Sequence, residues 1–395
     1  MGKYLIPLLV AVIGLSGCKS STPDLLPEYN VSWTIPSTDV TGSMPVGGGN
    51  IQLNAWSEGG DILFYMGSTD SYLDNGYTLG KLGRVRLNFH PNPFEDTFRQ
   101  ELHLKESEVV FTGDNGFKLT LWVDVFNPVV HAEMTSDIPV EVRTGYETWR
   151  LNQEYQDNKI LFYHRNPATN TALEKMVEAQ KAVSFRDKIT DPIVNLTSGG
   201  LIYADHFVPF AADSGVYMGT PYKTLQIKSE KPLQKMDLRV ALRIEQDPSL
   251  EKWIGQLNRL ADKTRGTEKD DRSKSLDWWR EFWNRSYIHI NPSGDASIAR
   301  AADIRTDSLS AAWQVGRNYQ LFRYMLGCSR GARLPVLFNG GIFNFDNENG
   351  KLPEYRNWQE CEFMAQNQRL VYWPLLKTGD NDIMQPVMNM YRNQV

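Results

Sequence analysis

The chain has 395 residues, enough for roughly two or three domains, and its 42 Lys and Arg against 47 Asp and Glu give a net charge of −5. Because no basic excess is available to neutralise a phosphate backbone, this composition argues against a nucleic-acid-binding protein. Only three cysteines occur, so the fold does not depend on a disulfide framework.

The N-terminus has the pattern of a secretory signal. Lys3 precedes an apolar run from Leu5 to Ile13, which is too short to span a membrane because a spanning helix needs about 20 apolar residues. Leu15-Ser16-Gly17-Cys18 then resembles the bacterial lipobox, whose cysteine is acylated and becomes the mature N-terminus. We therefore expect a signal peptide over residues 1–18, a lipid on Cys18 and a tether over 19–28. The alternative is an ordinary signal peptide with a chance cysteine.

The residue after this cysteine bears on the location of the protein. It is Lys19 and not the Asp associated with retention in the inner membrane. The resemblance therefore implies an outer membrane lipoprotein of a Gram-negative bacterium, held to the periplasmic or the cell-surface face through its N-terminal lipid.

From residue 29 to 245 the hydrophobic period is two. Arg84-Val85-Arg86-Leu87-Asn88-Phe89 and Leu238–Ile244 alternate polar and apolar residues, as on a sheet with one buried face. Turn clusters such as Gly47-Gly48-Gly49-Asn50 separate these runs. The pattern predicts a large antiparallel β-sandwich over residues 29–245, with a helical insertion over 174–182.

After residue 245 the period becomes helical. Asp247 and Pro248 predict the N-cap and first residue of a helix whose apolar face includes Trp253 and Leu257. Further helices are expected over 275–283, 303–326 and 357–377, with a new start at Asp380 and a polar loop over 331–356. We assign a helical linker to residues 246–295 and a helical domain to residues 296–395.

Seven of the 11 tryptophans lie in the last 143 residues. An indole face can pack on a sugar ring and its N–H can donate to a hydroxyl. Trp278, Trp279 and Trp283 have helical spacing, which favours core packing. Trp358 and Trp373 adjoin the polar loop, and for them a sugar platform and a core position remain equally open.

Carboxylates and amides near that loop are the other candidates. Glu360 and Glu362 are two residues apart, so on a helix they cannot face one another, although either could act with a distant partner. The alternative for both is an exposed or ion-paired surface position. Asn339 and Asn344 belong to a loop rich in asparagine, whose amides suit sugar hydroxyls but also suit turns.

No metal or cofactor is expected. The six histidines are scattered singly, and neither Cys328 nor Cys361 has a neighbour at metal-ligand spacing, so both thiols are expected to be buried and inert. Gly47-Gly48-Gly49-Asn50 is followed by a strand pattern and not by a helix, which argues against a phosphate-binding loop.

Two stretches resemble known families. The segment from Gly42 to Leu53, with Thr69–Tyr72 and Lys81–Arg86, resembles the bacterial family called domain of unknown function 5703. The opening from Gly42 to Ile51, with Asp61–Tyr65, also resembles the sandwich of the family 95 glycoside hydrolases. Farther along, three short segments are similar to the family 95 region on the first helices of an (α/α)6 six-hairpin barrel; they are Arg333-Leu334-Pro335, Gly340–Asn344 and Asn367–Pro374.

The resemblance implies a fold and a chemistry. It implies inverting hydrolysis of α-linked fucose or a related sugar by a Glu acid and an Asp base, which inversion places about 6.5–9.5 Å apart. Asn367 matches the second of two supporting asparagines, and Ala365 stands at the first. The acid/base pair of the family would lie downstream, beyond Val395.

Length then decides the interpretation. Twelve barrel helices need about 300 residues or more, and about 100 follow Pro292. We interpret the chain as part of a lipid-anchored, glycoside-hydrolase-like protein of carbohydrate degradation that is inactive as it stands. The alternatives are a non-catalytic carbohydrate-binding envelope lipoprotein and a structural envelope lipoprotein. An incomplete barrel would leave apolar side chains uncovered, namely Leu370, Trp373, Leu376, Ile383 and Val387.

Overall fold

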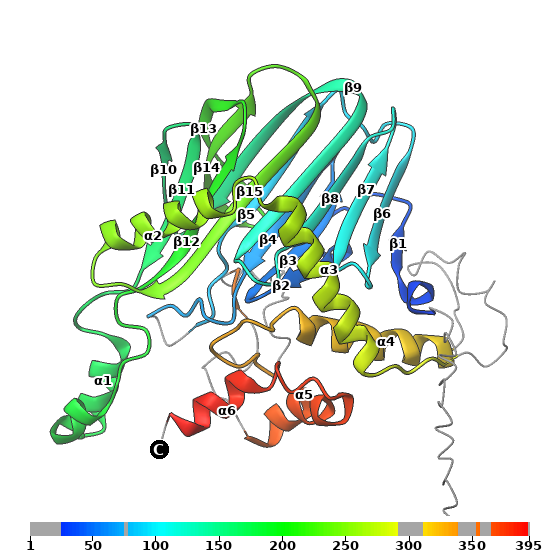
Figure 1. The fold of residues 1–395 in the computed structure, drawn as a ribbon. Coiled ribbons are helices and arrows are strands. Elements are labelled where there is room, and N and C mark those ends of the chain that lie inside the picture. The colour runs from blue at the N-terminus through cyan, green and yellow to red at the C-terminus, as the bar shows by residue number, and fades with distance from the viewer. Residues whose placement is uncertain (1–24, 75–77, 291–310, 339–352, 356–364, 394–395) are drawn as a thin grey trace, which may run out of the picture.

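A computed structural model describes residues 25–74, 78–290, 311–338, 353–355 and 365–393. Within them, antiparallel strands dominate the first two thirds and helices the remainder (Figure 1). The strands are β1 (Val31–Trp33), β2 (Met44–Gly48), β3 (Ile51–Glu58), β4 (Asp61–Gly67), β5 (Arg84–His90), β6 (Phe98–His103), β7 (Glu108–Gly113), β8 (Lys118–Val123), β9 (Val129–Thr148), β10 (Asn152–Gln156), β11 (Lys159–Arg165), β12 (Leu196–Ala204), β13 (Phe207–Tyr217), β14 (Thr220–Ser229) and β15 (Leu233–Gln246).

The strands form two layers that share one strand. The first layer has the order β1-β6-β7-β8-β9-β15-β12-β11-β10, and the second runs β2-β3-β4-β5-β9-β14-β13. The first half of β9 pairs with β8 and β15, whereas its second half pairs with β5 and β14. Pro139 lies between the two halves, where the strand leaves one layer for the other. A proline has no N–H for the ladder, so it suits this transition.

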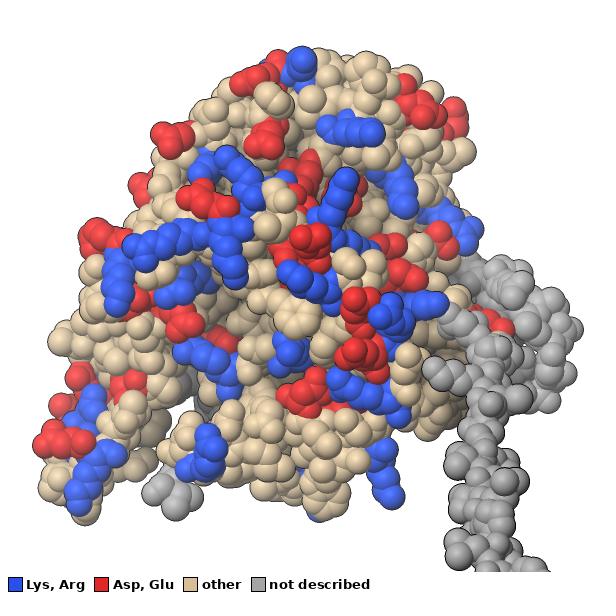
Figure 2. Space-filling model, viewed as in Figure 1, with Lys and Arg blue, Asp and Glu red and all other residues tan. Residues whose placement is uncertain are grey.

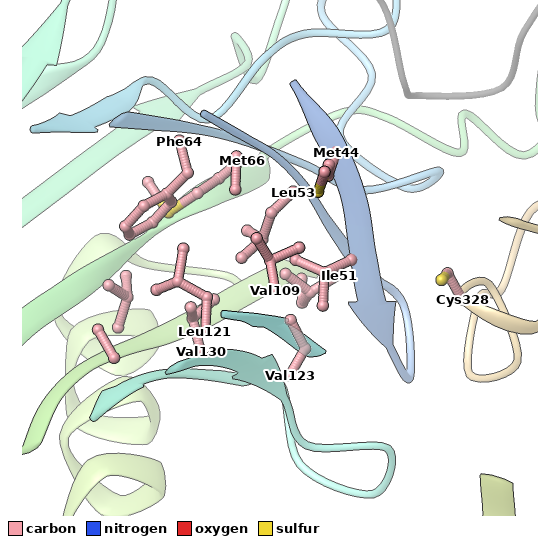
Figure 3. Close-up of a cluster of buried hydrophobic side chains, with 14 of the residues drawn as sticks. Met44, Ile51, Leu53, Phe64, Met66, Val109, Leu121, Val123, Val130 and Cys328 are labelled. Carbon is pink, nitrogen blue, oxygen red and sulfur yellow. The ribbon is translucent and has the colours of Figure 1, made fainter. Parts of the chain in front are cut away.

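Alternating side chains of the two layers meet in one hydrophobic core. Ile51, Leu53 and Phe64 of the second layer face Val109, Leu121 and Val130 of the first, and all are fully buried (Figure 3). The predicted strand alternation is therefore confirmed for these faces. Burial of a core side chain of this size stabilises the fold by about 1.5–3 kcal/mol.

The alternation also predicts a solvated outer face, and in several strands this is wrong, since β3, β4 and β12 are buried on both faces. In β5, Val85, Leu87 and Phe89 point into the core as expected, but Arg84 on the opposite face is also buried. Aromatic rings and an acidic partner cover it, as described below. The outer face of the second layer is therefore a packed surface at this row.

Six α-helices and three short 3-10 helices complete the described chain. They are α1 (Ala172–Ala179), α2 (Leu250–Lys263), α3 (Glu268–Arg285), α4 (Ala311–Gly327), α5 (Ala365–Thr378), α6 (Gln385–Arg392), η1 (Leu26–Tyr29), η2 (Val40–Gly42) and η3 (Val183–Lys188). Helix α1 is the predicted insertion between β11 and β12, and Thr171 and Glu174 form a capping box at its start.

Helix α2 lies on the outer face of the first layer (Figure 1). Trp253, Leu257 and Ala261 pack there against residues of β9, β11, β12 and β15. The predicted apolar face is confirmed, but the predicted N-cap is wrong. Ser249 caps the helix by accepting a hydrogen bond from the Lys252 amide, while the Asp247 carboxylate pairs with Arg243 instead.

Helix α3 starts at Glu268, seven residues before the predicted start, because its first two turns are charged and carry no apolar period. Its second half is aromatic. Trp278, Trp279 and Trp283 are buried, which confirms core packing, and the indole of Trp283 donates to the Leu104 carbonyl at 2.9 Å. Tyr324 of α4 lies 5.3 Å from Trp279, ring centroid to ring centroid.

Helices α5 and α6 follow in the C-terminal part. The guanidinium of Arg323 on α4 binds the Asp380 carboxylate with two buried hydrogen bonds of 2.8 and 2.9 Å, which fixes the turn between α5 and α6. Leu370, Trp373 and Leu376 are exposed as predicted, at 70%, 61% and 58%. Ile383 and Val387 are buried instead, because they join the main core.

None of the helices described is long and apolar enough to cross a membrane. The apolar run of residues 5–13 and Cys18 lie outside the described residues. The assignment of helices α4 to α6 to a barrel stays a prediction.

Candidate binding groove and the junction beside it

Most of the predicted site residues lie outside the described part of the chain. These are Asn339, Asn344, Trp358, Glu360 and Glu362, together with Cys18 and Cys361.

The two predicted residues that are described, Asn367 and Trp373, both belong to α5. Residues six apart point about 120° apart on a helix of 3.6 residues per turn. Asn367 is half-buried, whereas Trp373 is exposed with the Arg369 guanidinium 5.7 Å from its ring centre. The structure therefore does not bring Asn367 and Trp373 together on one surface.

Two neighbours on α5 have a clear role that was not predicted. Gln368 and Tyr372, four residues apart, share the buried face of the helix. The Gln368 amide donates to the Val336 carbonyl at 2.9 Å, and the Tyr372 hydroxyl accepts from the Val336 N–H at 2.7 Å. This pair clamps the backbone that follows Arg333-Leu334-Pro335 onto α5.

The stretches that carry the family resemblance meet at Asp70. Its buried carboxylate accepts hydrogen bonds from the backbone N–H groups of Arg333 and Leu334, at 3.2 and 2.9 Å, and from the Asn50 amide at 3.3 Å. Gln52 adds a second tie, since its amide donates to the Cys328 carbonyl and to the Ser329 hydroxyl, both at 2.8 Å. These polar residues join the sandwich to the helical part, and the side chains of Gln52 and Asp70 are buried in doing so.

Cys328 lies within this junction and is buried, as predicted for an inert thiol. Burial raises the pKa of its thiol well above the usual value. No group of His, Cys, Asp and Glu that could hold a metal ion occurs among the described residues.

An open groove lies on the outer side of the second layer. A cavity of about 790 Å³ is bounded by the end of β9, by β10 and by the hairpin of β13 and β14. Two aromatic side chains, Trp149 and Tyr222, line it, and the polar side chains around them are Arg150, Asn152, Gln153 and Lys223. No Asp or Glu is among its described lining residues.

One buried carboxylate holds the wall of the groove. Glu354 accepts hydrogen bonds from the indole N–H of Trp149 at 3.0 Å and from the Arg150 guanidinium at 2.6 Å. Its side chain is fully buried, so both groove residues are tied to the segment 353–355 of the helical part. Burial of the nearby His164 imidazole lowers its pKa, and the positive charge of Arg150 lowers it further. Through Trp149 and Arg150, the wall of the groove connects the sandwich to the C-terminal part.

A row of residues in register supports the groove from below. Tyr65, Arg84 and Glu147 are direct neighbours across β4, β5 and β9. Arg84 donates to Glu147 and, at 2.6 Å, to the Tyr65 hydroxyl. Its guanidinium carbon lies 3.8 Å from the ring centre of Tyr217 on β13 and 5.4 Å from the ring centre of Tyr222 on β14.

The comparison with protein families decides the membership of the chain. The family described as Domain of unknown function (DUF5703) matches residues 32–157 and 152–288, which is more than half of the chain. The chain belongs to this family. The resemblance seen in Gly42–Leu53, Thr69–Tyr72 and Lys81–Arg86 is thereby confirmed, and these DUF5703 segments lie beside the junction and the groove.

A solved structure is also similar to this DUF5703 chain. It is described as "Putative kojibiose phosphorylase from human microbiome", and the similarity has a TM-score of 0.41 and 12% sequence identity. The similarity covers 77% of this chain and 42% of that one, so the chain spans less than half the length of that protein. A search of the curated proteins gave no match.

Sequence reasoning did not find Trp149, Arg150 or Glu354. Trp149 and Arg150 directly follow β9, where the alternation of that strand ends. An aromatic residue and an arginine just after a long strand were the signal that could have indicated them. Nothing in the local pattern around Glu354 indicates its partners, because they lie about 200 residues earlier in the chain.

Proposed function

We propose that this protein is the carbohydrate-binding part of a lipid-anchored, glycoside-hydrolase-like protein of the cell envelope. The groove that Trp149 and Tyr222 line carries this proposal. Aromatic faces pack against the C–H groups of sugar rings, and the neighbouring amides of Asn152 and Gln153 match sugar hydroxyls. A relationship to the family 95 glycoside hydrolases, stated above as a resemblance, is part of the proposal.

Binding without cleavage is favoured by the lining of the groove. Inverting hydrolysis needs two carboxyl groups on opposite sides of the scissile bond. Among the described residues none lines the groove, and the adjacent Glu354 is engaged by Arg150 and Trp149. We therefore propose that this groove binds a glycan without cleaving it.

A glycan array with the full chain in detergent tests the binding site. We expect Tyr222→Ala to weaken binding of the retained glycan about tenfold, or about 1.4 kcal/mol, because the variant loses the aromatic face that packs on the sugar ring. Phe210→Ala is the matched control, because Phe210 is an exposed aromatic residue of β13 outside the groove. Equal binding by both variants and the wild type would exclude this groove as the sugar site.

An assay with aryl α-fucosides and α-galactosides tests the proposed lack of hydrolysis. General acid and general base each contribute about 10²–10⁴-fold, so a chain without the pair should release no detectable aglycone. Turnover that disappears in Glu360→Gln or Glu362→Gln would contradict the proposal, since it would place a working acid within this chain.

Metabolic labelling with a palmitate analogue tests the anchor. We expect label on the wild type and none on Cys18→Ala, because only an acylated cysteine at this position attaches the chain to the leaflet. Equal label on the two proteins would remove lipid anchoring from the proposal.

The non-catalytic envelope lipoprotein remains the second candidate. Sequencing the coding DNA after codon 395 distinguishes the two candidate functions. An in-frame continuation that encodes more helices and a Glu/Asp pair supports the glycosidase-like protein. A stop codon directly after codon 395 supports the free-standing binding protein.

A further inference from the structure

A second cavity lies on the other layer of the sandwich, beside α2. Its volume is about 400 Å³, within the usual range for small-molecule sites, and it shares no lining residue with the groove. The strand β15 supplies Arg243 and the helix α2 supplies Arg259 and Lys263. The amides of Asn50, Asn127 and Gln256 complete the polar part of the lining.

The positive charge of this cavity is only partly compensated. Among the described lining residues Glu245 is the single acidic one, and one of its oxygens lies 3.4 Å from a guanidinium nitrogen of Arg333. Lys263 donates to the neutral side chain of Asn127 at 3.2 Å. In the described part of the chain, Arg259 makes no ion pair with any carboxylate, although Asp262 is three residues away. Figure 2 shows Lys and Arg side chains gathered over α2.

One donor in this cavity lacks a partner. Arg243 binds Asp247 through Nη2 at 2.8 Å, but its Nε is buried and makes no hydrogen bond with any described residue. A buried donor without an acceptor costs free energy, so such groups are uncommon unless a ligand or an ion completes them.

Three cationic side chains lie close together on α2 and β15, although like charges repel one another. Arg259 and Lys263 stand four residues apart, so they lie on the same side of α2, where two like charges destabilise a helix. Arg243 faces this side from the neighbouring strand. Three cations from two elements thus converge on one concave surface, which favours an anion there.

We propose that this cavity binds a small anionic ligand, with Arg243, Arg259 and Lys263 meeting its carboxylate or sulfate group. A guanidinium presents planar paired donors that match such groups. Pro128, Leu242 and Leu260 form the apolar part of the lining, against which the carbon skeleton of the ligand packs. The Gln256 amide supplies a donor and an acceptor for its neutral polar groups, whereas the amides of Asn50 and Asn127 are held by Asp70 and by Asp124 and Lys263. This proposal does not depend on the carbohydrate groove.

Isothermal titration calorimetry with the full chain in detergent tests it, using three probes at low ionic strength. Inorganic sulfate and glucuronate carry the two anionic groups, and glucose is the neutral counterpart of glucuronate. We expect sulfate or glucuronate to bind and glucose not to bind at this cavity. Binding of sulfate alone identifies a sulfate group as the recognised chemistry, and binding of glucuronate alone identifies a carboxylate. Added salt should weaken either.

Arg259→Gln locates the binding, because this side chain is exposed and its loss should not affect folding. We expect affinity for the bound anion to fall about tenfold, as for loss of one charge-assisted hydrogen bond. Arg280→Gln on α3 is the matched control, since it removes the same charge from an exposed side chain away from the cavity. Failure of both anions to bind, or equal loss in the two variants, would overturn the proposal. Tyr222→Ala should leave anion binding unchanged, which separates this result from the carbohydrate proposal.

Discussion

The two layers of the sandwich have outer faces that are covered in different ways. On the first layer, α2 lays Trp253, Leu257 and Ala261 on an apolar patch that includes Val129 and Leu201. On the second layer none of the described helices performs this role for the row of Tyr65, Arg84 and Glu147, and tyrosine and tryptophan side chains cover it instead. Helix α2 closes the apolar patch beneath it but leaves a cavity beside it, whereas the aromatic cover of the second layer leaves a groove at its edge.

The difference shows why the groove can have a fixed shape. Arg84 is 1% exposed, and its guanidinium is held by Glu147, by the Tyr65 hydroxyl and by the ring of Tyr217. A buried ion pair of this kind adds little net stability, because desolvation offsets the attraction, but it strongly restricts the positions of its neighbours. The aromatic wall of the groove therefore rests on a rigid polar base.

The largest expected effect comes from uncovering the first layer. A fragment of residues 29–245 lacks α2 and α3, so the apolar patch and the aromatic end of the core become exposed. We expect it to aggregate or to melt without cooperativity, although the strand pattern alone suggests an independent sandwich. A fragment of residues 29–288 retains both helices and is the control. Circular dichroism melts of the two fragments measure the difference, and equal cooperative melts would show that the helices are dispensable.

The second layer is tested by Glu147→Gln. This change removes the charge that pairs with Arg84 and Arg86 and leaves Arg84 buried. Breaking a buried pair in this way costs about 3–5 kcal/mol. Urea unfolding measures the loss.

Glu141→Gln is the matched control for this variant. Glu141 lies on the same strand and pairs with Arg143, whose side chain is 43% exposed. Its loss should cost at most about 1 kcal/mol, as for other surface pairs. Equal losses of unfolding free energy for Glu147→Gln and Glu141→Gln would mean that the buried Arg84–Glu147 pair contributes no more to stability than an ordinary surface pair.

These two faces also show what the sequence can reveal. Alternation predicted the inward side chains of β5 and the apolar stripe of α2, since each follows from a local period. The burial of Arg84 has no local signal, because it depends on cross-strand register and on a hairpin more than 120 residues away. The same holds for Glu354, whose contacts with Trp149 and Arg150 are set by tertiary packing.

The cap of α2 tests how the first layer holds its helix. Ser249→Ala removes the side chain that accepts from the Lys252 amide, so we expect a loss of about 1 kcal/mol. Ser273→Ala, at an exposed position within α3, should be neutral or slightly stabilising because alanine favours helix. Chemical unfolding of both variants measures this. Equal stability of Ser249→Ala and the wild type would contradict the assignment of Ser249 as the cap.

The smallest expected effect concerns the part of the first layer that α3 covers. His103 on β6 contacts Glu108 at 3.1 Å and Glu101 at 3.8 Å, and Glu108 also binds Arg272 of α3. Hydrogen bonds to Glu101 and Glu108 raise the pKa of His103 to about 9 from a usual value near 6.5. The stabilisation from protonated His103 is therefore complete below about pH 6.5 and is lost as the pH rises through about 9.

Because His103 is partly exposed, we expect this contribution to be on the order of 1 kcal/mol after screening by solvent. Unfolding free energies measured from pH 6 to 10 should fall more steeply for the wild type than for His103→Gln. The exposed His206, replaced in the same way, controls for the loss of a histidine as such. The ion pairs of His103 beside α3 would then make stability depend on pH over this range, which the apolar patch under α2 does not. Parallel pH profiles for the wild type and His103→Gln would show that the ion pairs beneath α3 are solvated too well to have this effect.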